Sequence, residues 1–260
     1  MILTIDMGNS NIVVGGIDEN RLYFEERITT DHRKTSLEYA ILLKNILEIN
    51  KVKPSDIEGE IISSVVPPLN APVSSAVKKI IGKKPMLVGS GMKTGLNIKV
   101  DNPKTVGGDR IVAAVAAIAQ YKGPIIIIDM GTATTLDVID KNSCYIGGVI
   151  LPGITVSLNS LVSNTAQLPQ INLDVPKRVI GKNTVECMRN GIMYGNAAML
   201  DGLIDRIEHE LGEPATLIAT SGMARFIIPL CNHKITYVPD LLLRGLLILY
   251  SQNTTEPTRY

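Results

Sequence analysis

Short runs of apolar, often β-branched residues alternate with amphipathic stretches along the whole chain. In the first half, three such runs follow one another at residues 2–6, 12–17 and 22–28, which predicts three successive strands. A helix is predicted over "TSLEYAILLKNILEIN", because Thr35 and Glu38 have the spacing of a capping box. The pattern continues with a strand in "GEIISSVVPP", a helix in "NAPVSSAVKKIIG" and a strand in "PMLVG".

The second half repeats this opening. "IIIID", "TLDVID" and "CYIGGVILPG" predict three strands, and helices are predicted near residues 154–162 and 184–211. A strand at "ATLIAT", a helix after Gly222, a strand at "ITYV" and a helix through "DLLLRGLLILYS" complete the pattern. Strands covered by helices predict an α/β fold. The copies lie further apart than the ~20–50 residues of solenoid repeats, so the duplicated unit is a domain.

Two domains are therefore expected, at residues 1–116 and 117–260. The boundary near Ala116 falls in the predicted helix "GGDRIVAAVAAIAQYK", which we expect both halves to share. The last ten residues, "SQNTTEPTRY", are polar and are expected to be disordered.

Composition excludes several classes of protein. The net charge of +1 provides no field for nucleic acid or for an anionic membrane. The longest apolar stretch is interrupted before it reaches the ~20 residues of a membrane span, and the first residues lack the pattern of an export signal. Three widely spaced cysteines form neither a disulfide framework nor a zinc pattern. We expect a cytoplasmic protein without nucleic-acid or membrane partners.

Two similar turn sequences occur in the chain, "IDMGNSN" from residue 5 and "IDMGTAT" from residue 128. In each copy a buried strand ends on an aspartate, whose carboxylate can hold a hydrated cation. The following glycine lets backbone amides approach an anion, and hydroxyl or amide side chains add donors for phosphate oxygens. A single Asp-x-Gly turn is most simply a hairpin, whereas two matched copies favour a polyphosphate site. The chain contains no P-loop sequence.

These motifs resemble the superfamily of acetate and sugar kinases, heat-shock ATPases and actin, and more closely the type III pantothenate kinases. The resemblance rests on "DMGNSN", "NPKTVGGDR", "DMGTATT", "GGVILPG" and "GKNTVECMRNGIMYG", which occur in this order over nearly the whole chain. It implies two ribonuclease-H-like domains with a central cleft. It also implies ATP-dependent phosphorylation of pantothenate to 4'-phosphopantothenate, the first step of coenzyme A biosynthesis, by a homodimer.

The resemblance also implies roles for particular residues. Asp109 would be the general base that accepts the proton of the substrate hydroxyl. Asp6 would lie near magnesium through water, and Asp129 would hold a monovalent cation such as potassium or ammonium. The first phosphate loop would contain Asp6, Met7, Gly8, Asn9, Ser10, Asn11, Ile12 and Val13, and Thr132 would contact ATP from the second. The pantothenate contacts would be Val100, Gly107, Gly108, Asp109, Arg110 and Thr184.

Each role has a plainer alternative. Asp109 could be a first-turn residue that binds the free amides at a helix start. Arg110 could be half of a surface ion pair, and Thr184 could be an ordinary helix start. Met7 and Met130 suit packing. "TSG" at residues 220–222 is a weak candidate to border the adenine. Val100 departs from the tyrosine that the family usually carries, which removes a hydroxyl from that wall of the site.

Two other functions share the same motifs. One is a nucleotide-binding regulator on the same scaffold, which would not release ADP when pantothenate is added. The other is a kinase for another small alcohol or acid.

Overall fold

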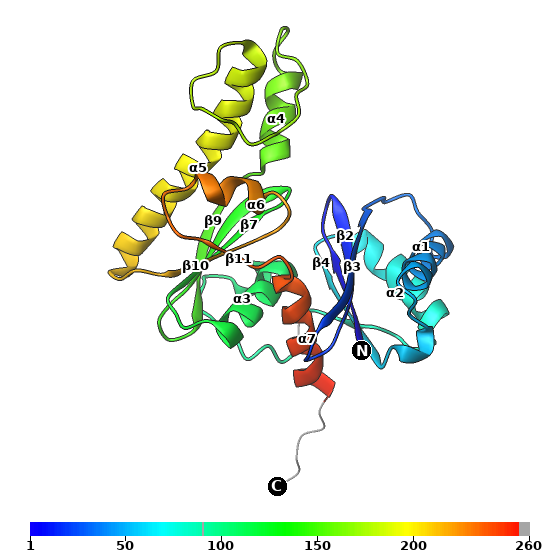
Figure 1. The fold of residues 1–260 in the computed structure, drawn as a ribbon. Coiled ribbons are helices and arrows are strands. Elements are labelled where there is room, and N and C mark those ends of the chain that lie inside the picture. The colour runs from blue at the N-terminus through cyan, green and yellow to red at the C-terminus, as the bar shows by residue number, and fades with distance from the viewer. Residues whose placement is uncertain (90, 255–260) are drawn as a thin grey trace. The chain divides into compact units, whose positions relative to one another are not determined.

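The computed structural model describes residues 1–89 and 91–254, and its contacts divide the chain into two compact units (Figure 1). Unit 1 comprises Met1–Leu96, Asn102–Ala119 and the segment from Asp240 onward. Unit 2 comprises Asn97–Asp101 and Gln120–Pro239. Among the described residues, no helix is long and apolar enough to cross a membrane.

Each unit contains one sheet, and the two sheets have the same core topology. Sheet 1 has the order β3-β2-β1-β4-β5, with β1 antiparallel to β2 and parallel to β4. Sheet 2 has the order β11-β10-β7-β8-β9-β6, in which β7 is likewise antiparallel to β8 and parallel to β10. The strands are β1 (Ile2–Met7), β2 (Asn11–Ile17), β3 (Leu22–Thr29), β4 (Gly59–Ser64), β5 (Met86–Leu87), β6 (Asn97–Ile98), β7 (Ile125–Met130), β8 (Ala133–Ile139), β9 (Cys144–Pro152), β10 (Thr216–Thr220) and β11 (Thr236–Tyr237).

Strands β1 to β5 therefore correspond to β7 to β11 in order and in direction. This correspondence confirms the predicted α/β class with two ribonuclease-H-like domains. The short strand β6, which pairs with the start of β9, was not predicted because two residues carry no periodic signal.

Helices cover both faces of sheet 1. Helices α1 (Ser36–Ile49) and α2 (Pro67–Ile81) contact each other and pack on one face (Figure 1). The predicted capping box of α1 is present. Helix α2 begins at Pro67 rather than at the predicted Asn70, since proline is well tolerated in a first helical turn. A 3-10 turn, η1 (Pro54–Asp56), precedes β4.

The opposite face of sheet 1 is covered by α3 (Gly108–Gln120) and α7 (Leu241–Thr254). A 3-10 turn, η2 (Pro103–Thr105), precedes α3. Helix α7 contacts β1, β2 and β4 and buries Leu246 and Leu249 against Ile2 and Ile61.

The expected domain limits differ from these units at three points, because Asn97–Asp101 belong to unit 2, whereas residues 117–119 and the segment from Asp240 onward belong to unit 1. Helix α7 was expected in the domain 117–260, but its apolar face packs on sheet 1, so it belongs to unit 1. Of the ten residues expected to be disordered, residues 251–254 are the last residues of α7, and residues 255–260 lie outside the described part of the chain. Helix α3 lies in unit 1 up to Ala119, and its sharing by both halves stays a prediction.

Unit 2 has a helical extension beyond its sheet. Helices α5 (Thr184–Leu211) and α6 (Ala224–Ile227) pack on sheet 2, and α4 (Ile154–Ser163) contacts α5 (Figure 1). A 3-10 turn, η3 (Ile228–Leu230), follows α6.

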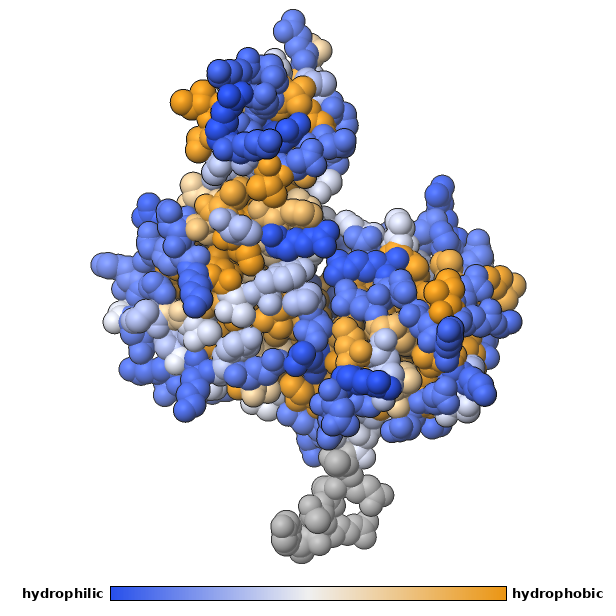
Figure 2. All heavy atoms as spheres, viewed as in Figure 1, coloured by the Kyte–Doolittle hydropathy of each residue, from blue (hydrophilic) through white to orange (hydrophobic). Residues whose placement is uncertain are grey.

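The end of unit 2 that contains α4, the start of α5 and the chain between them carries exposed apolar side chains. Figure 2 shows apolar atoms among hydrophilic ones on this part of the surface. The exposed residues here are Val156, Leu161, Val175, Val179, Ile180 and Val185. Ile180 is the most exposed of them, at 80%.

His233 connects the loop after η3 to α5 by two ionic contacts. Its Nδ1 lies 2.9 Å from Asp201 Oδ1, and its Nε2 lies 3.1 Å from Asp205 Oδ1. Asp201 also accepts hydrogen bonds from the backbone amides of Asn232 and His233. The hydrogen bond to Asp201, assisted by the charges of Asp205 and Glu208, raises the pKa of His233 above its ordinary value of 6.5.

This raised pKa predicts a pH-dependent contribution to stability. Protonated His233 stabilises the fold fully below pH 6.5, and the stabilisation is lost as the pH rises through the raised pKa. Replacing His233 by Gln should therefore destabilise the protein by about 1 kcal/mol or less at pH 5.5, since Asp205 is exposed, and by less at pH 9. Urea unfolding at both pH values measures the difference, with His209→Gln as the control. An equal effect at the two pH values would contradict the assignment.

Candidate functional site

The first hairpin places polar groups at the surface directly after a buried strand. Strand β1 ends at Met7, and β2 begins at Asn11. The amide of Gly8 donates to the carbonyl of Asn11 at 3.0 Å. Thr30, after β3, supports the turn: its hydroxyl donates to the Gly8 carbonyl at 2.6 Å and its amide to the Ser10 carbonyl at 3.0 Å. The side chains of Asn9, Ser10 and Asn11 are exposed.

The predicted first phosphate loop includes residues whose side chains lie in the core. Met7 and Ile12 are buried in the hydrophobic cluster below α1 and α2. Met130, the counterpart of Met7, is also buried. The methionines therefore have the packing role expected from the sequence, and Met7 and Ile12 can contact a ligand through backbone atoms alone.

The carboxyl ends of β1 and β4 form one edge of sheet 1. These strands are parallel, and Asp6 pairs with Ser63 in their register. Side chains alternate between the faces of a strand, so Asp6 and Ser63 point to the face where Ile2 and Ile61 meet α3 and α7. The pairing of β1 with β4 extends beyond this point, because the amide of Val65 donates to the Met7 carbonyl at 3.0 Å. Ligands of α/β proteins bind at such carboxyl ends.

Helix α3 begins at this same edge. A Cβ atom built on Gly108 would lie 3.6 Å from Ser63 Oγ, so the first turn of α3 lies against the end of β4. The structure thus brings the predicted residues Gly107, Gly108, Asp109 and Arg110 to the edge that carries Asp6. All of them belong to unit 1.

Asp109 lies half-buried in the first turn of α3. Its Oδ1 accepts a hydrogen bond from the amide of Arg110 at 2.8 Å. A Cβ atom on Gly107 would lie 2.5 Å from that oxygen, so glycine at this position makes room for the carboxylate. Asp109 therefore binds a backbone amide in the first turn of α3, which is the plainer role that the sequence left open, and its role as a base stays a prediction.

The second hairpin has the same design with a turn shorter by one residue. Asp6 pairs with Val13, whereas Asp129 pairs with Thr135. The amide of Gly131 donates to the Ala133 carbonyl at 3.0 Å. The amide of Gly153, which follows β9, donates to the Thr132 carbonyl at 3.0 Å. Gly153 therefore corresponds to Thr30, which follows β3 and donates to the Ser10 carbonyl of the first hairpin. The predicted ATP contact Thr132 is exposed.

Asp129 has a neighbour that sequence analysis did not identify. The hydroxyl of Ser221 donates to Asp129 Oδ1, and the backbone of Ser221 has a φ of 74°, which is rare for a residue other than glycine. Strand β10 brings these residues together because Thr220 pairs with Asp129. The sequence suggested residues 220–222 only as a border of the adenine. Aligning β4 with β10 would have pointed to Ser221, because Ser64, the last residue of β4, has the equivalent position in unit 1.

The remaining predicted pantothenate contacts lie in unit 2. Val100 is half-buried just after β6, and Thr184 is the exposed first residue of α5. Asn183 is the N-cap of α5, and its side chain accepts from the amide of Glu186. A hydrogen bond and ion pair with Arg178 at 2.8 Å, together with the amide of Lys182, lower the pKa of Glu186 to about 2. Thr184 is thus the first residue of a capped helix, which agrees with the alternative that it is an ordinary helix start.

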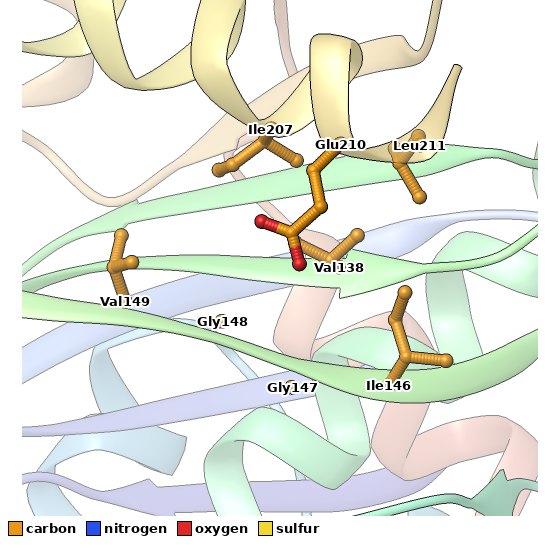
Figure 3. A pocket seen from close by; sticks show the side chains of 8 residues that line it. All are labelled: Val138, Ile146, Gly147, Gly148, Val149, Ile207, Glu210 and Leu211. Atoms are coloured by element: carbon orange, nitrogen blue, oxygen red, sulfur yellow. The ribbon is translucent and has the colours of Figure 1, made fainter. Parts of the chain in front are cut away.

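A hollow of ≈ 250 Å³ lies between the last turns of α5 and the strands β8 and β9 (Figure 3). The side chain of Glu210 points toward the strands between Ile207 and Leu211. Gly147 and Gly148 of the "GGVILPG" motif line the hollow. None of the predicted site residues lines it.

Comparison with known proteins gives a consistent result. The family model described as type III pantothenate kinase matches residues 2–206. The type III pantothenate kinase of Exiguobacterium sp. AT1b is 47% identical, with 97% of this chain and 99% of that protein aligned. That of Exiguobacterium sibiricum is 46% identical, with 97% and 100% aligned.

Solved structures show the fold alone, because their sequence identities are low. A Campylobacter jejuni protein described as a Baf family transcriptional activator aligns with a TM-score of 0.60 and 20% identity, over 96% of this chain and 98% of that one. A Sinorhizobium meliloti protein described as a 2-dehydro-3-deoxygalactonokinase aligns with a TM-score of 0.57 and 11% identity, over 100% of both chains.

Proposed function

This chain belongs to the type III pantothenate kinase family, and from that premise we propose how it phosphorylates pantothenate with ATP in coenzyme A biosynthesis. The family match supports the reaction. The start of α3, which carries Asp109, lies at the sheet edge of unit 1 that also carries Asp6, and this supports the assignment of residues. Phosphoryl transfer depends mainly on positioning and on neutralising charge, and the acceptor hydroxyl must lose its proton.

Asp109 is the general base in this proposal. Its carboxylate accepts the proton of the primary hydroxyl of pantothenate as the new phosphorus–oxygen bond forms. A carboxylate has two acceptor oxygens, so proton acceptance is compatible with the hydrogen bond from the Arg110 amide to Oδ1. Arg110 supplies planar donors that suit the carboxylate of pantothenate or the transferring phosphoryl group. Gly107 and Gly108 allow the substrate to approach the backbone.

Asp6 suits a hydrated magnesium ion. Its carboxylate lies at the end of β1, beside the hydroxyl of Ser63, and both groups are hard oxygen ligands or water acceptors. Magnesium would neutralise charge on the phosphates. The exposed side chains of Asn9, Ser10 and Asn11 and the backbone amides of the turn provide donors to phosphate oxygens.

Asp129 holds the monovalent cation in this proposal, and Thr132 contacts ATP. The hydroxyl of Ser221 orients the Asp129 carboxylate, since it donates to one of its oxygens. Val100 and Thr184 complete the contacts with pantothenate. Valine gives apolar contact at a position where the family usually carries tyrosine.

The reaction is tested with purified protein, ATP, magnesium, potassium and pantothenate. We expect ADP and 4'-phosphopantothenate in equal amounts, and a lower rate when sodium replaces potassium. ADP release and product mass are both measured. Nucleotide binding without pantothenate-dependent ADP would favour a regulator, and faster turnover of a sugar or another acid would favour a different kinase.

We also expect a cytoplasmic homodimer. The three free cysteines Cys144, Cys187 and Cys231 fit a reducing compartment. The exposed apolar side chains near the start of α5 offer a surface for a second copy. Sedimentation of the protein used in the kinase assay measures the mass, and a monomer at micromolar concentration would contradict the dimer.

A further inference from the structure

The hydroxyl of Ser63 is a buried polar group that the proposed mechanism does not yet use. Ser63 is 0% exposed, and within residues 1–89 and 91–254 its Oγ has no hydrogen-bond partner. An unpaired buried hydroxyl destabilises a fold, so native proteins retain few of them. Its presence here requires an explanation.

The duplicated fold supplies an internal comparison. Ser63 pairs with Asp6 between β4 and β1, and Thr220 pairs with Asp129 between β10 and β7, so the two hydroxyls occupy equivalent positions. The hydroxyl of Thr220 donates to the Pro239 carbonyl at 3.5 Å. The hydroxyl at this position thus has a protein partner in unit 2 and none among the described residues of unit 1.

The surroundings of Ser63 indicate which partner is missing. Its side chain lies on the same face as Asp6, and the first turn of α3 lies against it. The next residue, Ser64, has a different role, because its Oγ accepts from the Val66 amide at 3.0 Å and holds the turn into α2. Ser63 is therefore a neighbour both of the proposed magnesium-binding carboxylate and of the helix that carries the proposed base.

We propose that Ser63 binds the hydrated magnesium ion that accompanies ATP, with its Oγ accepting a hydrogen bond from a water molecule of the ion. Magnesium keeps several of its waters when it binds to proteins, and these waters donate hydrogen bonds, so an acceptor oxygen beside a single carboxylate is a suitable partner. This inference rests on the proposed function, and it adds a second residue to the magnesium site of Asp6.

The test compares Ser63→Ala with Ser64→Ala. Without ligand, Ser63→Ala should melt at the wild-type temperature or above it, because the change removes an unpaired buried hydroxyl. With ADP, the additional stabilisation that magnesium gives over EDTA should be smaller than in the wild type. The magnesium concentration that gives half-maximal kinase rate should rise about tenfold, while the KM for pantothenate stays unchanged. Ser63→Thr should restore the magnesium response, since threonine occupies the equivalent position in unit 2.

The matched control has the opposite signature. Ser64→Ala should lower the melting temperature by about 2–4 °C and leave the magnesium response of the folded protein unchanged. An unchanged magnesium response in Ser63→Ala overturns the proposal. So does a loss of stability without ligand, or a weaker ADP effect in EDTA, which would make a phosphate oxygen, and not a magnesium-bound water, the partner of Ser63. The melting experiments do not need turnover, so failure to phosphorylate pantothenate would overturn the proposed function and leave this test intact.

Discussion

Replacing Asp109 by Asn is expected to lower kcat by about 10²–10⁴-fold, because an amide cannot accept the proton of the substrate hydroxyl. The change preserves size and keeps Oδ1 as an acceptor for the Arg110 amide, so the first turn of α3 stays capped. The melting temperature and the KM for ATP should change little. Steady-state ADP release, checked by the mass of phosphopantothenate, measures the effect.

The control for this variant is Asp101→Asn. Asp101 is an exposed aspartate eight residues earlier in the chain and belongs to unit 2. It should keep the wild-type rate, since it removes a carboxylate without touching the sheet edge of unit 1. A variant at Asp109 that turns over at the wild-type rate would leave the carboxylate with its capping role alone.

Replacing Gly245 by Ala is expected to lower the stability of unit 1 by about 1–3 kcal/mol. A Cβ atom at this position in α7 would lie 2.2 Å from the carbonyl oxygen of Val112 in α3. That atom belongs to a helix backbone and cannot move aside as a flexible side chain can. The two helices must separate, which exposes Leu246 and Val112 of the shared cluster. Urea unfolding measures the loss.

Gly202 provides the matched change in another helix. It lies inside α5, and a Cβ atom there would meet nothing within 4 Å. Alanine should therefore stabilise the protein by about 0.5–1 kcal/mol, because it restricts the unfolded chain and favours the helix. If both alanine variants shift the unfolding midpoint in the same direction, close contact of α7 with α3 does not explain the role of Gly245.

The duplicated fold could be predicted because its signals are local. Apolar runs such as residues 125–128 and the capping box at Thr35 depend on neighbouring residues, and the structure has the strand and the helix that they predict. The meeting of Asp6 with the start of α3 is different, since about a hundred residues separate them in the chain. Their proximity follows from the parallel pairing of β1 with β4, which periodicity does not specify.

The residues that sequence analysis missed share one property. Thr30, Ser63 and Ser221 each support or adjoin a hairpin from another strand, and a lone serine or threonine has no distinctive spacing. The placement of α7 was missed for a similar reason. Its apolar face could pack on either sheet, and only the shape of the packed surfaces decides between them.

Helix α7 also determines the order in which this protein can be completed on the ribosome. Sheet 1 is synthesised first, but one of the helices covering it emerges only after every strand of unit 2. Unit 2 is continuous from Gln120 to Pro239 and can begin to collapse as it emerges. The first half of the nascent chain therefore keeps part of an apolar face uncovered until α7 has been synthesised.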